Sequence, residues 1–204
     1  MDKAYWEKYY RDHPEPSPPS AFALAMVDHL VKPGTLIDLG CGNGRDAVFF
    51  GLQVNLAVVA IDQCEAEIDR LASKYAQSSL QFVAQDFSAY RPSHKVDNVY
   101  SRWTMHAIDE SAEDQTLQWV ADTLTDGGRL VVEARSISDD LYGVGEAVGP
   151  HAFVTDHYRR FMDKERFISK LEKLGLAILH SIESRGLAKK EDDDPVIVRI
   201  VAER

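Results

Sequence analysis

A strand that runs directly into a series of glycines is the feature that most restricts the fold of this chain. Residues 36–45 read LIDLGCGNGR, with glycine at every second position from Gly40 to Gly44. This spacing indicates a backbone that turns tightly and passes close to a ligand, because glycine has no side chain. A strand, a glycine loop and a helix in that order form a ligand-binding unit at the carboxyl edge of a parallel sheet.

The rest of the chain repeats this alternation of strands and helices. Helices are predicted at 44–51, 64–76, 111–124 and 163–174. The predicted strands are 35–40, 56–62, 80–86, 96–102 and 128–134, and a hairpin with a charged tip is predicted from 177–183 and 195–202. Because the strands are continuous apolar runs, we expect a parallel sheet that helices cover on both faces.

Two segments depart from this pattern. Residues 1–20 are predicted to form an aromatic helix at about 3–11 and a proline-rich linker. One face of that helix carries Tyr5, Trp6, Tyr9 and Tyr10, and it either packs on the core or closes as a lid over a ligand. Residues 21–204 are predicted to form the main domain, with an insertion at about 137–160 that replaces a further helix and is expected on the substrate side.

Composition limits the class of protein further. The 204 residues suffice for one α/β domain, and a formal charge of -10 without a lysine- or arginine-rich block disfavours nucleic acid as a partner. No apolar run is long enough to span a bilayer, and the first residues do not resemble a signal peptide. The two cysteines, Cys41 and Cys64, form no metal-binding pattern, so we expect a cytoplasmic protein without a disulfide framework or a structural metal. The acidic run 191–194 is interpreted as a solvated turn.

The glycine series matches neither the phosphate-binding nor the dinucleotide-binding glycine motif. The phosphate-binding pattern GxxxxGK[ST] is absent. The dinucleotide pattern is GxGxxG. When it is counted from Gly40, Arg45 stands in place of the third glycine. When it is counted from Gly42, Ala47 stands at that position, but the motif is then shifted away from the strand. Asp38 precedes the first glycine, and its charge would repel a pyrophosphate but attract a cationic ligand.

The segment LIDLGCGNGR resembles the first motif of class I S-adenosylmethionine-dependent methyltransferases, and the resemblance extends over residues 34–204. It implies a Rossmann-like, seven-stranded, mostly parallel sheet with helices on both faces and a C-terminal antiparallel hairpin. It also implies that S-adenosylmethionine is the cofactor.

The resemblance assigns parts of the cofactor to particular residues. The amino-acid portion would lie against Asp38, Gly40, Gly42 and Gly44, and the ribose hydroxyls would bind Asp62 beside Gln63. A carboxylate suits a pair of hydroxyl donors. The adenine would lie by Asp86 and Phe87, and Ser101 begins the segment SRWTMHAI that faces methionine and substrate. Each aspartate has a second interpretation, because Asp often caps the helix that follows a strand.

The acceptor is less strongly indicated than the donor. The motifs of nucleic-acid amine and base-carbon methyltransferases are absent after the fourth strand. Arginine binds anions in bidentate fashion, and histidine can act as a base. We therefore expect the methyl acceptor to be an O or N atom of a small, anionic molecule or of a glycan end. The predicted catalytic residues are His157, His106, Arg159 and Arg160. The predicted substrate-binding residues are Arg102, Trp103, Arg135 and Tyr158.

Alternatives to each part of this prediction stay open. The cluster 157–160 is also compatible with a solvated helix start in which one arginine pairs with Asp156 or Asp163, and His106 with a structural histidine. The insertion and the C-terminal sequence resemble tailoring methyltransferases of bacterial surface polysaccharides. The alternative functions are a non-catalytic S-adenosylmethionine-binding regulator or partner subunit and, less well supported, an NAD-dependent oxidoreductase.

Overall fold

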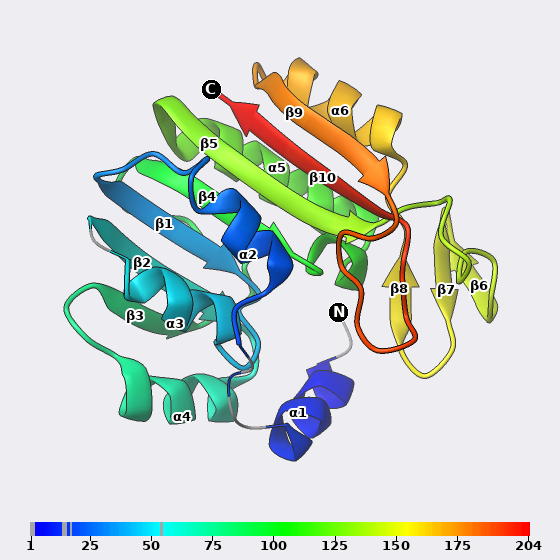
Figure 1. The fold of residues 1–204 in the computed structure, drawn as a ribbon, viewed down its shortest axis with the longest axis horizontal. Coiled ribbons are helices and arrows are strands. Elements are labelled where there is room, and N and C mark those ends of the chain that lie inside the picture. The colour runs from blue at the N-terminus through cyan, green and yellow to red at the C-terminus, as the bar shows by residue number, and fades with distance from the viewer. Residues whose placement is uncertain (1–2, 14–15, 17, 54) are drawn as a thin grey trace.

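A seven-stranded sheet forms the centre of the molecule (Figure 1). The computed structural model describes residues 3–13, 16, 18–53 and 55–204, so residues 14, 15 and 17 of the predicted linker lie outside the described residues. The strand order is β3-β2-β1-β4-β5-β10-β9. The strands are β1 (Gly34–Leu39), β2 (Leu56–Asp62), β3 (Leu80–Ala84), β4 (Val96–Arg102), β5 (Leu124–Arg135), β9 (Ala177–Ser184) and β10 (Ile197–Glu203).

The direction of the chain reverses across the sheet between β1 and β4. From β1 the chain moves outward to β2 and β3, and it then returns to place β4 on the other side of β1. These strands are parallel, and Leu39 of β1 lies beside Ser101 of β4. Such a switch point leaves a crevice outside the carboxyl ends of the strands, which is where open α/β sheets bind ligands.

Helices bury both faces of the sheet in two separate apolar clusters. One cluster joins the sheet to α5 (Glu110–Thr123) and α6 (Lys164–Lys173), and the other joins it to α2 (Ala21–Met26), α3 (Arg45–Gly51) and α4 (Glu65–Tyr75). Successive strand residues alternate between the clusters: Leu130 and Val132 belong to the first and Val131 to the second. This alternation explains the continuous apolar runs of the central strands, because both of their faces meet a helix layer.

Three segments gather at the carboxyl edge of the parallel strands (Figure 1). They are α1 (Lys3–Asp12), the loop between β9 and β10, and a three-stranded antiparallel sheet of β6 (Glu146–Gly149), β7 (Ala152–Val154) and β8 (Tyr158–Arg160). A 3-10 helix, η1 (Met105–Ala107), follows β4 at the same edge. These segments supply the walls of the crevice.

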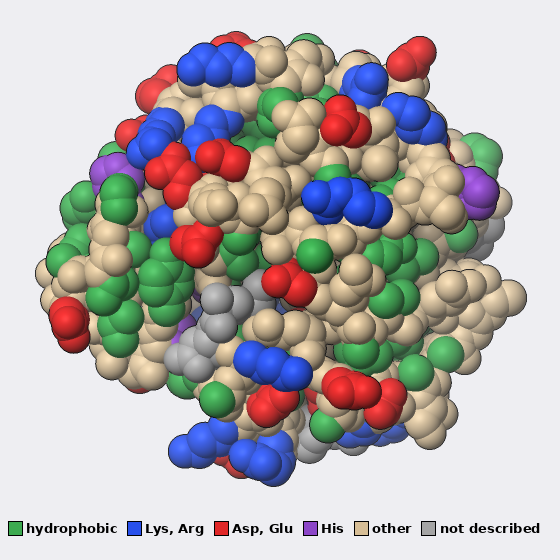
Figure 2. Space-filling model, turned by 180° about the vertical axis from the view of Figure 1, so that it is seen from behind, with side chains coloured by type: hydrophobic (Ala, Val, Ile, Leu, Met, Phe, Trp, Pro, Cys, Tyr) green, Lys and Arg blue, Asp and Glu red, His purple; other side chains and the backbone are tan. Residues whose placement is uncertain are grey.

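The structure confirms the predicted fold class, including the antiparallel pair β9 and β10. Two local expectations were wrong. Helix α2 was not predicted, and residues 158–160 form a strand rather than a helix start. Within the described residues, no helix combines the length and apolar character needed to cross a bilayer. Acidic and basic side chains lie intermingled on the back of the molecule (Figure 2).

Replacing a core residue of the C-terminal hairpin tests how strongly that hairpin is held to the sheet. Ile200 is fully buried in the cluster beneath α5 and α6. Ile200→Ala should lower the free energy of unfolding by about 2–5 kcal/mol, since it removes apolar contacts and leaves a cavity. Leu179 on the neighbouring strand is 50% exposed, so Leu179→Ala should change stability by less than about 1 kcal/mol. Urea denaturation measures both values, and equal losses would contradict this account of the core.

Candidate functional site

The candidate site is a cavity at the carboxyl edge of the large sheet. Its volume is about 680 Å³, which is in the range of small-molecule and cofactor sites. The glycine loop, α1, η1, the ends of β2, β4 and β5, and residues 187–190 contribute to its lining. The cavity brings together most of the predicted site residues: Asp38, Gly40, Gly42, Asp62, Gln63, Phe87, Arg102, Trp103, His106, Arg135, His157 and Arg159.

The glycine loop leaves no room for side chains where it meets its neighbours. Gly40 and Gly42 have φ angles of 65° and 55°, in the left-handed region that glycine adopts readily. A Cβ on Gly40 would stand 2.3 Å from the Thr104 side chain, and one on Gly42 would stand 2.8 Å from the Tyr10 hydroxyl. Gly44 instead precedes α3 and packs on Leu71, away from the cavity.

Two buried aspartates form an acidic wall beside this loop. Asp62 accepts hydrogen bonds from the backbone N–H of Gly42 at 3.1 Å and of Cys64 at 2.9 Å, so the end of β2 is tied to the loop. Burial raises the pKa of Asp62, and these N–H groups oppose the shift. Burial, followed by the charges of Asp46 and Asp62, raises the pKa of Asp38 well above its usual value. A cation placed here would be favoured by both carboxylates.

The predicted adenine and ribose residues divide between the cavity and its surroundings. Phe87 is buried and lines the cavity, as does Gln63, whose Nε2 is buried without a hydrogen-bond partner among the described residues. Such a donor calls for an acceptor from a ligand. Asp86 is exposed outside the cavity lining and accepts hydrogen bonds from the backbone and hydroxyl of Ser88. Ser101 is buried against Thr104 and lies outside the lining as well.

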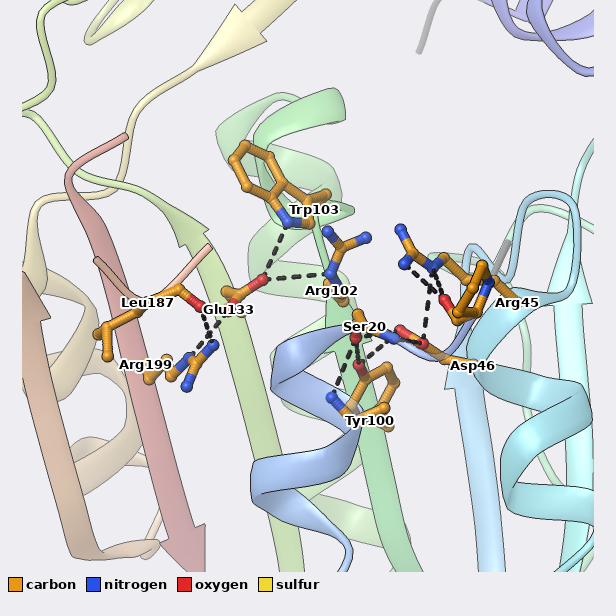
Figure 3. Close-up of polar contacts among 11 residues, drawn as sticks. Ser20, Arg45, Asp46, Tyr100, Arg102, Trp103, Glu133, Leu187 and Arg199 are labelled. Carbon is orange, nitrogen blue, oxygen red and sulfur yellow. Dashed lines mark hydrogen bonds and ion pairs between the residues drawn. The ribbon is translucent and has the colours of Figure 1, made fainter. Parts of the chain in front are cut away.

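A third buried aspartate, Asp46, holds the start of α2 against the sheet (Figure 3). It accepts hydrogen bonds from the backbone and the hydroxyl of Ser20, both at 2.7 Å, and from the Tyr100 hydroxyl at 2.8 Å. Arg45, the residue that replaces the dinucleotide glycine, donates twice to the Pro18 carbonyl. This network was not predicted from the sequence. An acid on the apolar face of a short helix is nevertheless a sign that buried hydrogen-bond donors pair with it.

The opposite wall of the cavity is built around Glu133, which is fully buried on β5 (Figure 3). Its carboxylate accepts hydrogen bonds from Trp103 Nε1 at 2.9 Å and Arg199 Nε at 2.8 Å, and it lies 3.2 Å from Arg102 Nε. Burial raises the pKa of Glu133, and the two guanidinium groups oppose that shift. Sequence reasoning missed Glu133; the available signal was an acid inside the apolar run RLVVEA, which requires partners once buried.

The predicted arginines occupy different environments. Arg135 is bound by Asp139 and Asp193, and its guanidinium lies 5.2 Å from the centre of the Trp103 ring. Arg159 also lines the cavity and pairs with Asp156 at 2.9 Å. Arg160 lies outside this cavity, where it binds Glu113 and donates to the Ile108 carbonyl. Tyr158 shares with Arg160 the lining of a second hollow.

Two histidines face the cavity from different elements. His157 lies within 3.0 Å of Asp156 and stacks on Tyr5 of α1 with 4.2 Å between ring centres. His106 is buried on η1, and both of its ring nitrogens lack a hydrogen-bond partner among the described residues. Burial, followed by the charges of His157 and Arg159, lowers the pKa of His106 well below its ordinary value.

The aromatic face of α1 covers this cavity. Tyr5, Trp6, Tyr9 and Tyr10 all line it, and none of them belongs to the two apolar clusters of the core. The Tyr5 hydroxyl donates to Asp156 at 3.3 Å, which connects α1 to the turn before β8. No group of three or more potential metal ligands occurs within the described ranges of the chain.

Comparison with known families identifies the central part of the chain. Residues 36–128, which include the glycine loop and η1, match the model of a family described as methyltransferase domain. This part of the chain is therefore similar to a methyltransferase domain. This match and the sheet topology confirm the resemblance to class I methyltransferases that the glycine series indicated. A search of curated proteins finds no match to the chain.

Solved structures of methyltransferases share this fold. A 1,6-didemethyltoxoflavin-N1-methyltransferase from Burkholderia thailandensis, with 1,6-didemethyltoxoflavin and S-adenosylhomocysteine bound, is 19% identical with a TM-score of 0.69, over 89% of this chain and 76% of that chain. A TehB-like methyltransferase from Corynebacterium glutamicum is 19% identical with a TM-score of 0.67, over 91% and 88%. N-methyltransferase NodS from Bradyrhizobium japonicum is 13% identical with a TM-score of 0.65, over 100% and 99%.

Neutralising Glu133 should destabilise the methyltransferase domain strongly. Glu133→Gln leaves Arg102 and Arg199 without their shared counter-charge, and loss of one partner from a buried ion pair costs about 3–5 kcal/mol. Glu203 on β10 also pairs with an arginine of β5, Arg129, but both side chains of that pair are about 30% exposed. Glu203→Gln should therefore cost less than about 1 kcal/mol. Chemical denaturation compares the two variants, and similar losses would contradict a buried role for Glu133.

Proposed function

We propose that this chain transfers a methyl group from S-adenosylmethionine to an O or N atom of a small, anionic molecule. One observation carries the proposal: a single cavity has buried aspartates beside a glycine loop on one wall and arginines with an unpaired histidine on the other. The first wall suits a cationic methyl donor, and the second suits an acceptor that carries negative charge.

The residues of the first wall fit the cofactor. The sulfonium of bound S-adenosylmethionine supplies an activated methyl group with a good leaving group. Asp38 lies where the cationic amino-acid portion would be attracted, and Asp62 and Gln63 would hold the ribose side. The left-handed turns at Gly40 and Gly42 permit the close approach of the backbone. Phe87 offers an apolar neighbour for the adenine, and the S-adenosylhomocysteine bound to the related Burkholderia enzyme supports this assignment.

The second wall favours a negatively charged acceptor. Arg102 Nε lies 3.2 Å from Glu133, and the other nitrogens of that guanidinium have no hydrogen-bond partner among the described residues, so a ligand can bind them. The exposed residues Lys189 and Lys190 also belong to the lining of the cavity, and neither has a carboxylate partner among the described residues. Nitrogen as the acceptor atom is supported by the activity named for the Burkholderia and Bradyrhizobium proteins.

The position of α1 supports its assignment as a lid over the cofactor. Tyr10 contacts the glycine loop directly at Gly42, and Tyr5 reaches His157 on the acceptor side. The helix therefore bridges both walls of the cavity. Excluding water in this way favours methyl transfer to the acceptor over competing reactions with solvent.

Calorimetry with S-adenosylmethionine, S-adenosylhomocysteine and NAD tests the donor. We expect the first two to bind and NAD not to bind. Asp38→Asn should weaken binding of S-adenosylmethionine about tenfold or more, because it removes a charged contact. Since the pKa of Asp38 is raised, wild-type affinity should fall as the pH drops through that raised value, and the variant should lose this dependence.

Asp69→Asn, which alters an exposed aspartate of α4, is the matched control and should bind like the wild type. Tight binding of NAD, or equal affinity in the Asp38 and Asp69 variants, would contradict the proposed donor site.

Turnover with a panel of small carboxylates tests the acceptor. The panel comprises 4-hydroxybenzoate, anthranilate and imidazole-4-carboxylate, which offer O–H or N–H groups, and mass spectrometry detects the methylated products. Arg159→Ala should lower kcat/KM about 10- to 100-fold with unchanged cofactor affinity, since it removes a charged contact to the acceptor.

Arg166→Ala removes an arginine of α6 that pairs with Glu110 away from the cavity, and it should leave kcat/KM unchanged. Cofactor binding without methylation of any panel member would instead favour the non-catalytic regulator or partner subunit. An Arg159 variant with wild-type kcat/KM would exclude Arg159 from acceptor binding.

A further inference from the structure

In the proposed function, the side of the cavity with Asp38 and Asp62 is the donor wall, and the side with Arg102, Arg135 and Arg159 is the acceptor wall. On the acceptor wall, the buried imidazole of His106 has no hydrogen bond at all from the described residues. It is 5% exposed, it lines the cavity, and neither Nδ1 nor Nε2 has a hydrogen-bond partner there. Buried polar atoms nearly always have a partner, so an imidazole left unsatisfied inside a cavity indicates a group that a ligand completes.

His106 lies where the donor and acceptor walls meet. It belongs to η1, which begins directly after Thr104, and the Thr104 methyl group fills the space above Gly40 of the glycine loop. On its other side, the ring of His106 makes an edge contact with Trp103, with 5.3 Å between ring centres. Glu133 fixes the Trp103 indole, so the turn that carries His106 is held at both ends.

The charges around His106 keep its ring neutral. Arg102 at the end of β4, Arg135 at the end of β5, Arg159 of β8 and His157 before it line the same cavity and act electrostatically on the imidazole. The carboxylates near these groups are already engaged: Glu133 by Arg102 and Arg199, Asp193 by Arg135, and Asp156 by His157 and Arg159. Burial and these cations lower the pKa of His106, and a neutral imidazole has a lone pair that can receive a proton.

We propose that His106 is the general base of the reaction and that the acceptor is an O–H or N–H group that loses its proton during methyl transfer. In this step the acceptor O or N atom forms a bond to the methyl carbon. The bond between that carbon and sulfur breaks, and its electron pair stays on sulfur. The acceptor proton moves to a ring nitrogen of His106 and then to solvent. The inference rests on the proposed function and excludes acceptor atoms without a proton, such as thioethers and tertiary amines.

The cations around His106 suit this step. They disfavour a second positive charge on the imidazole, so the proton is released to solvent after each turnover. They also stabilise the negative charge that develops on the acceptor atom as its proton leaves. The three arginines among these groups carry guanidinium groups, which stay charged at any pH of interest.

The test compares His106→Gln with the wild type on the panel member that turns over fastest. Gln keeps a similar volume and polar character but cannot act as a base at neutral pH. We expect kcat to fall about 10²- to 10⁴-fold, while calorimetry gives an unchanged affinity for S-adenosylmethionine. The acid limb of the wild-type kcat profile should lie below pH 6.5, the ordinary histidine value, and it should be absent from the variant.

A second variant separates catalysis from folding. His106→Gly should be inactive, and added imidazole should restore activity in proportion to the concentration of the neutral form. His94→Ala changes an exposed histidine outside the cavity and should have wild-type activity. The inference would be overturned if His106→Gln kept the wild-type kcat. It would also be overturned if both His106 variants lost activity but imidazole gave no rescue and the pH profile did not change. Either outcome would leave the methyltransferase proposal intact. Wild-type enzyme that methylates no panel member would contradict the proposed function itself, and the inference would fall with it.

Discussion

A single buried carboxylate organises the arginine-lined wall of the cavity. Glu133 lies opposite Arg102 of β4 on one side and opposite Arg199 of β10 on the other, so three neighbouring strands carry an Arg–Glu–Arg row. Moving these charges out of water costs several kcal/mol per ion, and only full pairing with good geometry offsets that cost. The row therefore fixes the relative position of the strands, and through Trp103 Nε1 it also fixes the turn after β4.

The strain at that turn shows why the carboxylate is needed. Trp103 has a φ angle of 61°, which is unfavourable for a residue with a Cβ. Such a conformation persists only where the surroundings hold it. Here the indole is bound by the Glu133 side chain, and the Trp103 backbone N–H donates to the backbone carbonyl of Glu133 at 2.9 Å. In this conformation the turn places Thr104 against the glycine loop and His106 in the cavity lining. The strained residue Trp103 therefore positions groups on both sides of the cavity.

The sequence predicts which residues gather on the glycine-loop side of the cavity better than which gather on the arginine side, for a physical reason. The glycine loop, Asp38 and Asp62 follow from local patterns at the ends of strands, which parallel topology places at one edge. Arg159 and Arg160 were predicted as one cluster because HYRR was interpreted without its strand. In a strand, adjacent side chains point to opposite faces, so Arg159 faces the cavity and Arg160 binds Glu113. The strands β6 to β8 are only three or four residues long, and they carry no apolar alternation to predict them.

The two walls also differ in where they come from along the chain. The acids and glycines of the donor wall lie within residues 36–128, the part that matches the methyltransferase domain family. Arg135, His157, Arg159 and the loop 187–190 lie beyond that part. His106 lies inside the matched part and lines the same cavity as these later residues. A base at the position of His106 can serve different methyl acceptors. Every O–H or N–H group that is methylated must present its proton near the same methyl carbon.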